Sequence, residues 1–495
     1  MTSDSPDPLI LVLDEGTTST RALVFDLNGS IAAATARPLT QSYPQSGWVE
    51  HDADEIWALS LECLHEAAAA AGVERIAAVG ITNQRETIVA WDRLTGKPLA
   101  PAIVWQDRRT AGRCAELRAQ GLEAQVQATT GLLLDPYFSA TKIGWLLDNC
   151  PAVRAASRDR RLLVGTIDTW LLYQLTHGGV HATDATNAGR TLLMDLRTGD
   201  WDPALAARFG VPLAALPRVT DCAGPLGLTR LLGRELPITA SVGDQHAAAI
   251  GQGCLQPGMV KATYGTGIFL LAHTGAQPRA SSHRLLSTLA WRLDRCPVYA
   301  LEGSVFTGGA AVQWLRDGIG LIETAADTEA LARSVPDTGG VVVVPAFTGM
   351  GAPHWRADVR GIVTGLTAAT TRAHVVRATL AAMAHQTADL LKALAADGVL
   401  PTVLRVDGGM VANDWLCQHL ADILDLPVER PRVIETTALG CAMLAALGAG
   451  LFPTLAAATA AMRQPGERFE PAMDAATRAA DSAAWDHAVR QALTP

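Results

Sequence analysis

The stretch LDEGTTSTRALVF at residues 13–25 decides the fold of this chain. It reads as the end of one apolar strand, a turn rich in Gly and Thr, and a second apolar strand. The stretch KATYGTGIFLLAH at residues 261–273 repeats the same plan in the other half of the sequence. Such turns expose backbone N–H groups and small hydroxyls without a bulky side chain that would keep an anion away. Two of them in one chain predict two lobes that grip one polyphosphate.

Length and composition agree with a chain of more than one domain. The chain has 495 residues, of which 49% are hydrophobic and 18% are charged, and a globular domain commonly contains about 100–200 residues. The formal net charge of −9 argues against a general nucleic-acid-binding protein, because sequence-independent binding to phosphates needs a basic surface. Contacts to a nucleotide must therefore come from local groups and a metal ion.

Nothing in the sequence predicts export or a membrane span. The eight cysteines are scattered without a C-x-x-C pair or the spacing of a zinc site, and the segment MTSDSPDPLI lacks the basic residues of a secretory signal. We therefore expect reduced thiols and a cytoplasmic protein. Residues 436–462 carry no charge, but Gly448, Gly450 and Pro453 interrupt them. We expect a buried helix and a turn there, because a spanning helix needs about 20 predominantly apolar residues.

Strand and helix patterns alternate along the chain, which indicates an α/β fold. The first half predicts strands at residues 9–13, 22–25, 76–82, 103–105, 162–165 and 238–242, and helices at 55–71 and from about 108. The second half predicts helices around 309–316 and 372–394, a strand at 403–406 and a helix from 413. A Gly-rich segment at 251–258 lies between the halves. We expect two similar domains, residues 1–252 and 253–495, with a cleft between them.

Polar side chains follow four of the predicted strands. In open α/β sheets, ligands bind beyond the carboxyl ends of the strands. A single residue of this kind is more often a turn former, part of a surface ion pair or a packing residue. The joint placement of several such residues is what indicates a site. The residues that follow the four strands are Asp14, Arg85, Glu86, Trp105, Asp244 and Gln245.

These residue types fit phosphoryl transfer to an alcohol. That reaction needs a base for the hydroxyl proton, a divalent cation on the phosphates and donors for the transferring oxygens. Asp244 is the candidate base, Asp14 is the candidate ligand of hydrated Mg²⁺, and the turns at residues 16–18 and 265–267 can steady the phosphates. A small uncharged polyol needs fixed donors and acceptors for its hydroxyls. Arg85, Glu86, Asp244 and Gln245 offer these groups, and Trp105, Tyr137 and Phe269 offer apolar walls for the carbon chain.

The sequence lacks the motifs of other nucleotide-binding and hydrolytic classes. It contains no G-x-x-x-x-G-K-[ST] loop, no strand-borne G-x-G-x-x-G with a partner acid, no HRD or DFG element and no H-E-x-x-H. P-loop enzymes, Rossmann dinucleotide-binding proteins, protein kinases and zinc peptidases with the H-E-x-x-H motif are thereby excluded.

By the residues singled out above, the chain resembles the FGGY family of carbohydrate kinases from about residue 9 to 451. The matching segments include LDEGTTSTR (13–21), GITNQRET (80–87), GDQHAA (243–248), TYGTG (263–267) and RVDGGMVAND (405–414). The resemblance implies an actin-like ATPase fold, in which two ribonuclease-H-like domains close over the acceptor and ATP.

The resemblance also implies ATP-dependent phosphorylation of glycerol and roles for individual positions. Asp244 would be the general base, and Asp14 and Asp244 would lie near Mg²⁺. The first domain would carry the polyol pocket and the second the adenosine site. Glycerol would contact Arg85, Glu86, Trp105, Tyr137, Asp244, Gln245 and Phe269. The nucleotide would lie against Thr17, Thr18, Arg21, Thr266, Gly309, Gln313, Gly409 and Asn413.

Two alternatives stay open at this point. Members of the family that act on pentuloses or longer polyols share the nucleotide-binding parts, so erythritol, threitol, xylulose or ribulose could replace glycerol. The second alternative is an actin-type clamp that binds a nucleotide without catalysis. The assembly is also open, with a homodimer or a homotetramer as the options considered.

Three positions depart from the family pattern. Glu15 stands where many relatives have Gln, and a carboxylate beside a phosphate turn repels anions, so we expect Glu15 to face outward or to pair with a cation. His246 and His385 replace a usual Gln and a usual Tyr, and we expect His246 to start a helix rather than bind a ligand. Residues 224–237 also lack the Gly-rich basic loop with which some bacterial relatives bind a sugar bisphosphate inhibitor.

Overall fold

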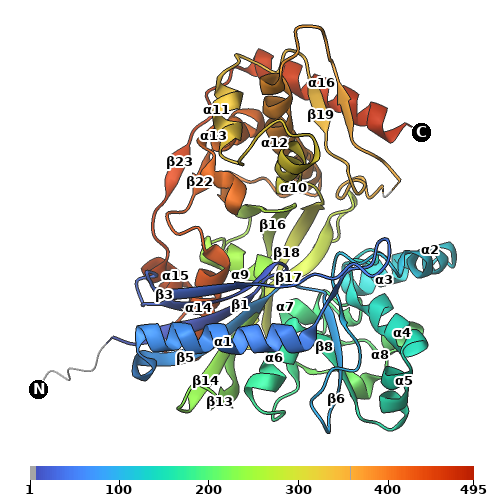
Figure 1. Cartoon of the computed structure of the whole chain (residues 1–495), viewed down its shortest axis with the longest axis vertical. Coiled ribbons are helices and arrows are strands. Elements are labelled where there is room, and N and C mark those ends of the chain that lie inside the picture. The colour runs from blue at the N-terminus through green and yellow to red at the C-terminus, as the bar shows by residue number, and fades with distance from the viewer. Residues whose placement is uncertain (1–6, 357, 495) are drawn as a thin grey trace, which may run out of the picture.

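The protein folds into two lobes, seen one above the other in Figure 1. The computed structural model describes residues 7–356 and 358–494. Most of the first half of the chain forms the lower lobe, and helices α10 (Gly309–Gln313), α12 (Arg372–Ala396) and α13 (Asp414–Leu424) lie in the upper lobe (Figure 1). Each lobe is built on one large mixed sheet.

The first sheet has six strands in the order β13-β14-β5-β1-β2-β3. Strands β1, β5 and β14 run parallel, whereas β2 and β3 pair antiparallel with their neighbours. The bounds are β1 Leu9–Glu15, β2 Ser19–Phe25, β3 Ile31–Pro38, β5 Ile76–Asn83, β13 Ala223–Thr229 and β14 Leu236–Gly243. The hairpin predicted around the first Gly/Thr turn is therefore confirmed.

Strand β1 is buried on both faces, as its unbroken apolar run predicts. Leu9, Leu11 and Leu13 pack into the core that contains helices α1 (Ala53–Ala71) and α6 (Ile167–Leu175). Ile10 and Val12 point to the opposite face and pack against α14 (Thr436–Gly448). Two covered faces explain why every position of this run is apolar.

The second sheet has seven strands in the order β17-β18-β16-β15-β21-β22-β23. Strand β15 pairs antiparallel with β16 and parallel with β21, which repeats the arrangement of β1, β2 and β5. The bounds are β15 Val260–Tyr264, β16 Ile268–Gly275, β17 Leu286–Leu293, β18 Cys296–Val305, β21 Leu404–Asp407, β22 Val428–Arg430 and β23 Glu467–Phe469. The same sheet design thus occurs twice.

The charge-free stretch at 436–462 forms two buried helices rather than one helix and a turn. Helix α14 crosses α9 (Asp244–Gly251) closely, since a methyl group on Gly440 would lie 1.9 Å from the Ala247 carbonyl oxygen. Helix α15 (Leu455–Met462) follows, and in Figure 1 both helices lie beside the first sheet. No helix among residues 7–356 and 358–494 is long and apolar enough to cross a membrane. Helix α14 belongs to the second half of the sequence but lies beside the sheet of the first half (Figure 1). The domain division after residue 252 therefore stays a prediction.

Two predicted elements differ from the structure. Strand β7 is limited to Ala102–Ile103, so Trp105 lies in the loop that follows it, and the next helix, α2, begins at Ala111. The helix predicted around 309–316 divides into α10 and a π-helical turn at Trp314–Gly318. In both places the local apolar pattern predicted that an element exists, but not the residue at which it ends.

Candidate active site

The site lies where the strand ends of the two sheets meet. Parallel strands place their carboxyl ends at one edge of a sheet, so β1, β5 and β14 bring Asp14, Arg85 and Asp244 to the same edge. Glu86 follows with a φ of 63° and is buried. A buried non-glycine residue in this left-handed region is held there by its surroundings, and such residues cluster at functional sites.

Five of the predicted polyol-binding side chains form one connected group of contacts. The Trp105 ring centroid lies 5.6 Å from that of Tyr137 and 5.9 Å from that of Phe269. Arg85 Nε lies 3.1 Å from Asp244 Oδ1, and Arg85 Nη2 lies 3.5 Å from the Tyr137 hydroxyl. Because Phe269 comes from β16 in the second lobe, both lobes build this group of side chains.

Asp244 is the exposed member of this charged group. Its side chain keeps 30% of its surface accessible, compared with 2% for Arg85. Burial of the carboxyl group raises the pKa of Asp244, and the nearby Arg85 and Lys261 oppose this rise. Asp244 also opens helix α9, and its Oδ1 accepts a hydrogen bond of 2.7 Å from the Gln245 amide. A carboxylate fixed in this way can accept a proton from a ligand in the cleft.

Glu86 and Gln245 lie in the same site, and each accepts a hydrogen bond from a basic side chain. Glu86 Oε1 accepts a 2.6 Å hydrogen bond from Arg190 Nε, and Gln245 Oε1 accepts one from the Lys261 ammonium. Burial raises the pKa of Glu86, while Arg85 and Arg190 act against it. The predicted polyol-binding residues are thus brought together, with three basic partners around them.

The first hairpin places Asp14 opposite Arg21 in the register of β1 and β2. The Arg21 guanidinium donates to Asp14 and also lies 2.5 Å from Glu435. Burial raises the pKa of Asp14, and Arg21 counteracts the shift. The charge of Asp14 in turn raises the pKa of Asp244, which lies at the same edge of the sheet.

The carboxylates Asp14 and Asp244 fit a magnesium ion that arrives with a nucleotide. No group of three or more His, Cys, Asp or Glu side chains that could hold a metal occurs in the part of the chain that the structure describes. Mg²⁺ is commonly bound by one or two carboxylates together with substrate phosphates and water. Two acidic groups at the edge of the cleft are therefore a sufficient protein contribution.

The expectation for Glu15 is wrong. Its side chain is fully buried and accepts hydrogen bonds from Thr20 Oγ1 at 2.7 Å and from Ser60 Oγ at 3.2 Å. Successive residues of a strand point to opposite faces, so Glu15 lies under α1 while Asp14 faces the cleft. Burial raises the pKa of Glu15 well above its ordinary value. A raised pKa favours the neutral form of Glu15, which weakens its repulsion of an anion.

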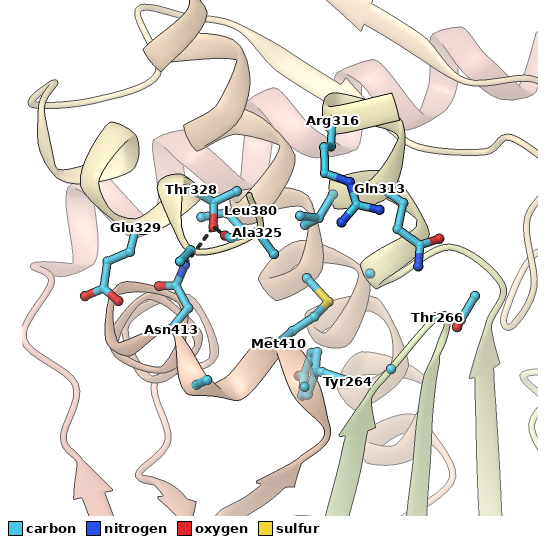
Figure 2. Close-up of a pocket in the computed structure, with 16 residues that line it drawn as sticks. Tyr264, Thr266, Gln313, Arg316, Ala325, Thr328, Glu329, Leu380, Met410 and Asn413 are labelled. Atoms are coloured by element: carbon cyan, nitrogen blue, oxygen red, sulfur yellow. Dashed lines mark hydrogen bonds between the residues drawn. The ribbon is translucent and has the colours of Figure 1, made fainter. Parts of the chain in front are cut away.

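The second lobe contains a pocket of about 420 Å³ (Figure 2). Figure 2 shows Gln313 and Arg316 on one side, Thr328 and Asn413 on the other, and a hydrogen bond of 3.2 Å between the last two. Five predicted nucleotide-binding residues line it: Thr266, Gly309, Gln313, Gly409 and Asn413. Thr17, Thr18 and Arg21 are not among its lining residues and lie on the first hairpin. Thr17 Oγ1 accepts a 2.9 Å hydrogen bond from Trp105 Nε1.

Glycine is required where the second turn meets α10. The Gly309 amide donates to the Gly265 carbonyl oxygen at 2.7 Å. A methyl group on Gly309 would come within 2.8 Å of the same oxygen. The backbones can approach this closely only without a side chain, and this contact forms one edge of the pocket.

Sequence reasoning missed three buried charges in the site, namely Arg190, Lys261 and Glu302. Lys261 begins the second quoted hairpin, and burial lowers its pKa. Glu302 stands in the middle of the apolar strand β18. A carboxylate inside an apolar run was the available signal, because a buried charge needs a partner.

The other two departures behave as structural residues. His246 lies in the first turn of α9, as expected, and is fully buried. Burial lowers the pKa of His246 well below its ordinary value. His385 lies in α12 and stacks on Trp485 with ring centroids 5.4 Å apart.

Comparison with known proteins finds relatives that match almost the whole chain. The N-terminal domain of the FGGY family of carbohydrate kinases matches residues 9–251, and its C-terminal domain matches residues 260–449. Glycerol kinases from Rhodospirillum centenum and Rhodospirillum rubrum are 56% and 55% identical to the chain. Each match covers 98% of this chain and 98% or 99% of the relative.

Solved structures agree. A crystal structure of Plasmodium falciparum glycerol kinase with ADP superimposes with a TM-score of 0.92 at 36% identity and covers 99% of both chains. A xylulose kinase from Rhodospirillum rubrum superimposes with a TM-score of 0.84 at 27% identity, over 98% of both chains. These matches confirm the predicted pair of actin-like ATPase domains.

Proposed function

The chain belongs to the FGGY family of carbohydrate kinases, and from this premise we propose that it transfers the terminal phosphate of ATP to a primary hydroxyl of glycerol. The products are sn-glycerol 3-phosphate and ADP. One observation carries the proposal: Arg85 lies beside both the partly exposed carboxylate of Asp244 and the hydroxyl of Tyr137, and Tyr137 belongs to an aromatic group with Trp105 and Phe269. Relatives named glycerol kinase that span almost the whole chain support the choice of acceptor.

Asp244 is the general base of this reaction. Its accessible carboxylate accepts the proton of the hydroxyl as that oxygen attacks the terminal phosphorus. A base works best when its pKa approaches the working pH, and burial shifts the pKa of Asp244 upward, in that direction. Arg85, held 3.1 Å from Asp244, keeps the carboxylate oriented.

The polyol lies between charged and aromatic groups. Arg85 donates to a hydroxyl, while Glu86, Asp244 and Gln245 accept from hydroxyls. The carbon chain lies against Trp105, Tyr137 and Phe269. The ring centroids of Tyr137 and Phe269 lie 5.6 and 5.9 Å from that of Trp105. A site built to pair hydroxyls rejects molecules that lack them, because its buried polar groups would be left unpaired.

ATP spans the two lobes in this proposal. The nucleoside occupies the pocket lined by Thr266, Gly309, Gln313, Gly409 and Asn413. The phosphates reach toward the first hairpin, where Thr17, Thr18 and Arg21 lie. Asp14 and Asp244 would hold Mg²⁺, and the bound ion would neutralise charge on the phosphates. A cytoplasmic location is part of this proposal, since ATP is available there.

A panel of acceptors tests the proposal. The purified protein is incubated with ATP, Mg²⁺ and one of glycerol, erythritol, threitol, xylulose or ribulose, and ADP release is measured. We expect glycerol to give the highest kcat/KM and no appreciable turnover without an acceptor. Preference for another compound would assign a different acceptor, and ATP turnover independent of every acceptor would contradict a kinase.

A further inference from the structure

A continuous series of buried ion pairs joins the polyol site to the second lobe. Glu86 Oε1 lies 2.6 Å from Arg190 Nε, and Arg190 Nη2 lies 2.9 Å from Glu302 Oε1. Glu302 Oε2 lies 2.6 Å from Arg85 Nη1, and Arg85 Nε lies 3.1 Å from Asp244 Oδ1. Acidic and basic groups alternate along the series, so each charge is next to its opposite.

Glu302 enters this series from the other lobe. It is carried by β18 of the second sheet, whereas Arg85 follows β5 of the first sheet and Arg190 follows the short helix α7 (Ala185–Ala188). The side chains of Glu302 and Arg190 have no accessible surface. The contact therefore fixes the position of two first-lobe arginines relative to the second lobe.

The two arginines depend on Glu302 for charge balance. Each is nearly or fully buried, and their guanidinium groups converge on the same carboxylate. Burial by itself raises the pKa of Glu302, but Arg190 and Arg85 outweigh this and hold it below the ordinary value. Glu302 is consequently a carboxylate at neutral pH, and removal of its charge would leave the cations uncompensated in a dry environment.

We propose that Glu302 is a positioning residue for the phosphoryl transfer, which holds Arg85 against Asp244 and Arg190 against Glu86 and thereby shapes the polyol pocket from the second lobe. This inference deepens the proposed function and rests on it. Glu302 has no part in binding the nucleotide, because it does not line the nucleotide pocket. Its loss should change the handling of the polyol and leave ATP binding intact.

The test compares Glu302→Gln with the wild-type protein and with a matched control. Glu429→Gln is the control, because Glu429 also lies in the second lobe and accepts from Arg405, Arg463 and Arg468 away from the site. For Glu302→Gln we expect the KM for glycerol to rise about 10- to 100-fold, the size of a lost charged hydrogen bond. The KM for ATP should change less than about twofold, because Glu302 does not line the nucleotide pocket. Glu429→Gln should match the wild type in both KM values.

A second variant covers the case in which Glu302→Gln does not fold. Glu302→Asp keeps the charge but shortens the reach, so the KM for glycerol should rise while the KM for ATP stays unchanged. An unchanged KM for glycerol in both folded variants, or equal rises in the KM values for glycerol and ATP, would overturn the inference. Wild-type turnover in the same assay separates the two proposals, since its absence would contradict the kinase assignment rather than the role of Glu302.

Discussion

The first and second hairpins share one backbone plan but carry different chemistry. In both, a strand pairs antiparallel on one side and parallel on the other. At the first, Asp14 faces Arg21 across the ladder, whereas at the second, Thr263 faces Phe269. The fold therefore supplies two turns that are alike in backbone and present different side chains.

The residues just before the two turns show the same design in detail. Glu15 lies under α1 and accepts a hydrogen bond from Ser60, and Tyr264 lies under α12 with its hydroxyl 2.8 Å from Thr387 Oγ1. Burial raises the pKa of both groups. A polar side chain that anchors the turn to a helix hydroxyl is thus common to both lobes, while the groups that face the cleft differ.

The largest effect is expected when Asp244, the proposed base, is replaced. Asp244→Asn keeps the size of the side chain but cannot accept the hydroxyl proton, so we expect kcat to fall by about 10²–10⁴. Steady-state kinetics with glycerol checks this, and near-normal turnover would contradict the role of Asp244.

Removal of Arg85 tests the acceptor side while the carboxylate of Asp244 is retained. Arg85→Ala should weaken polyol binding by about 1.5–3 kcal/mol, the range for a charged hydrogen bond, which appears as a higher KM for glycerol. Arg37→Ala is the control, because Arg37 pairs with Glu62 and Glu66 on an exposed surface. A KM for glycerol equal in the two variants would remove Arg85 from the pocket.

A substitution at the second turn should have the opposite selectivity. Gly309→Ala places a methyl group 2.8 Å from the Gly265 carbonyl oxygen, and overpacking of this kind costs roughly 1 kcal/mol or more. We expect a higher KM for ATP with little change in the KM for glycerol. Gly112→Ala, where a methyl group meets no atom within 4 Å, serves as the control. If glycerol binding suffers instead, the division of labour between the turns is wrong.

The smallest effect is expected at Glu15, and it should depend on pH. The raised pKa of folded Glu15 means that the folded state holds a proton that the unfolded state releases above the ordinary value of 4.5. Stability of the wild type therefore falls as pH rises above that value. Glu15→Gln does not titrate, so its Tm relative to the wild type should be higher at pH 8 than at pH 5. A Tm difference that is the same at both pH values would show that Glu15 is charged.

Local patterns predicted much of the fold and the site. The apolar runs gave β1, β5 and β14, and the polar residues at their ends gave Asp14, Arg85 and Asp244. A carboxylate inside an apolar strand marks Glu302 as unusual, but the sequence does not reveal its partners, because Arg85 and Arg190 lie far from it along the chain. Glu15 was misjudged because the strand was expected to end before it, whereas β1 continues through Glu15 and turns its side chain inward.

A structure of the protein with glycerol and a non-hydrolysable ATP analogue tests the central claim most directly. We expect a primary hydroxyl of glycerol within hydrogen-bond distance of the Asp244 carboxylate, and the nucleoside against Thr266, Gly309 and Asn413. The terminal phosphate should lie between the two turns. Glycerol bound away from Asp244, with the nucleotide in place, would contradict the account.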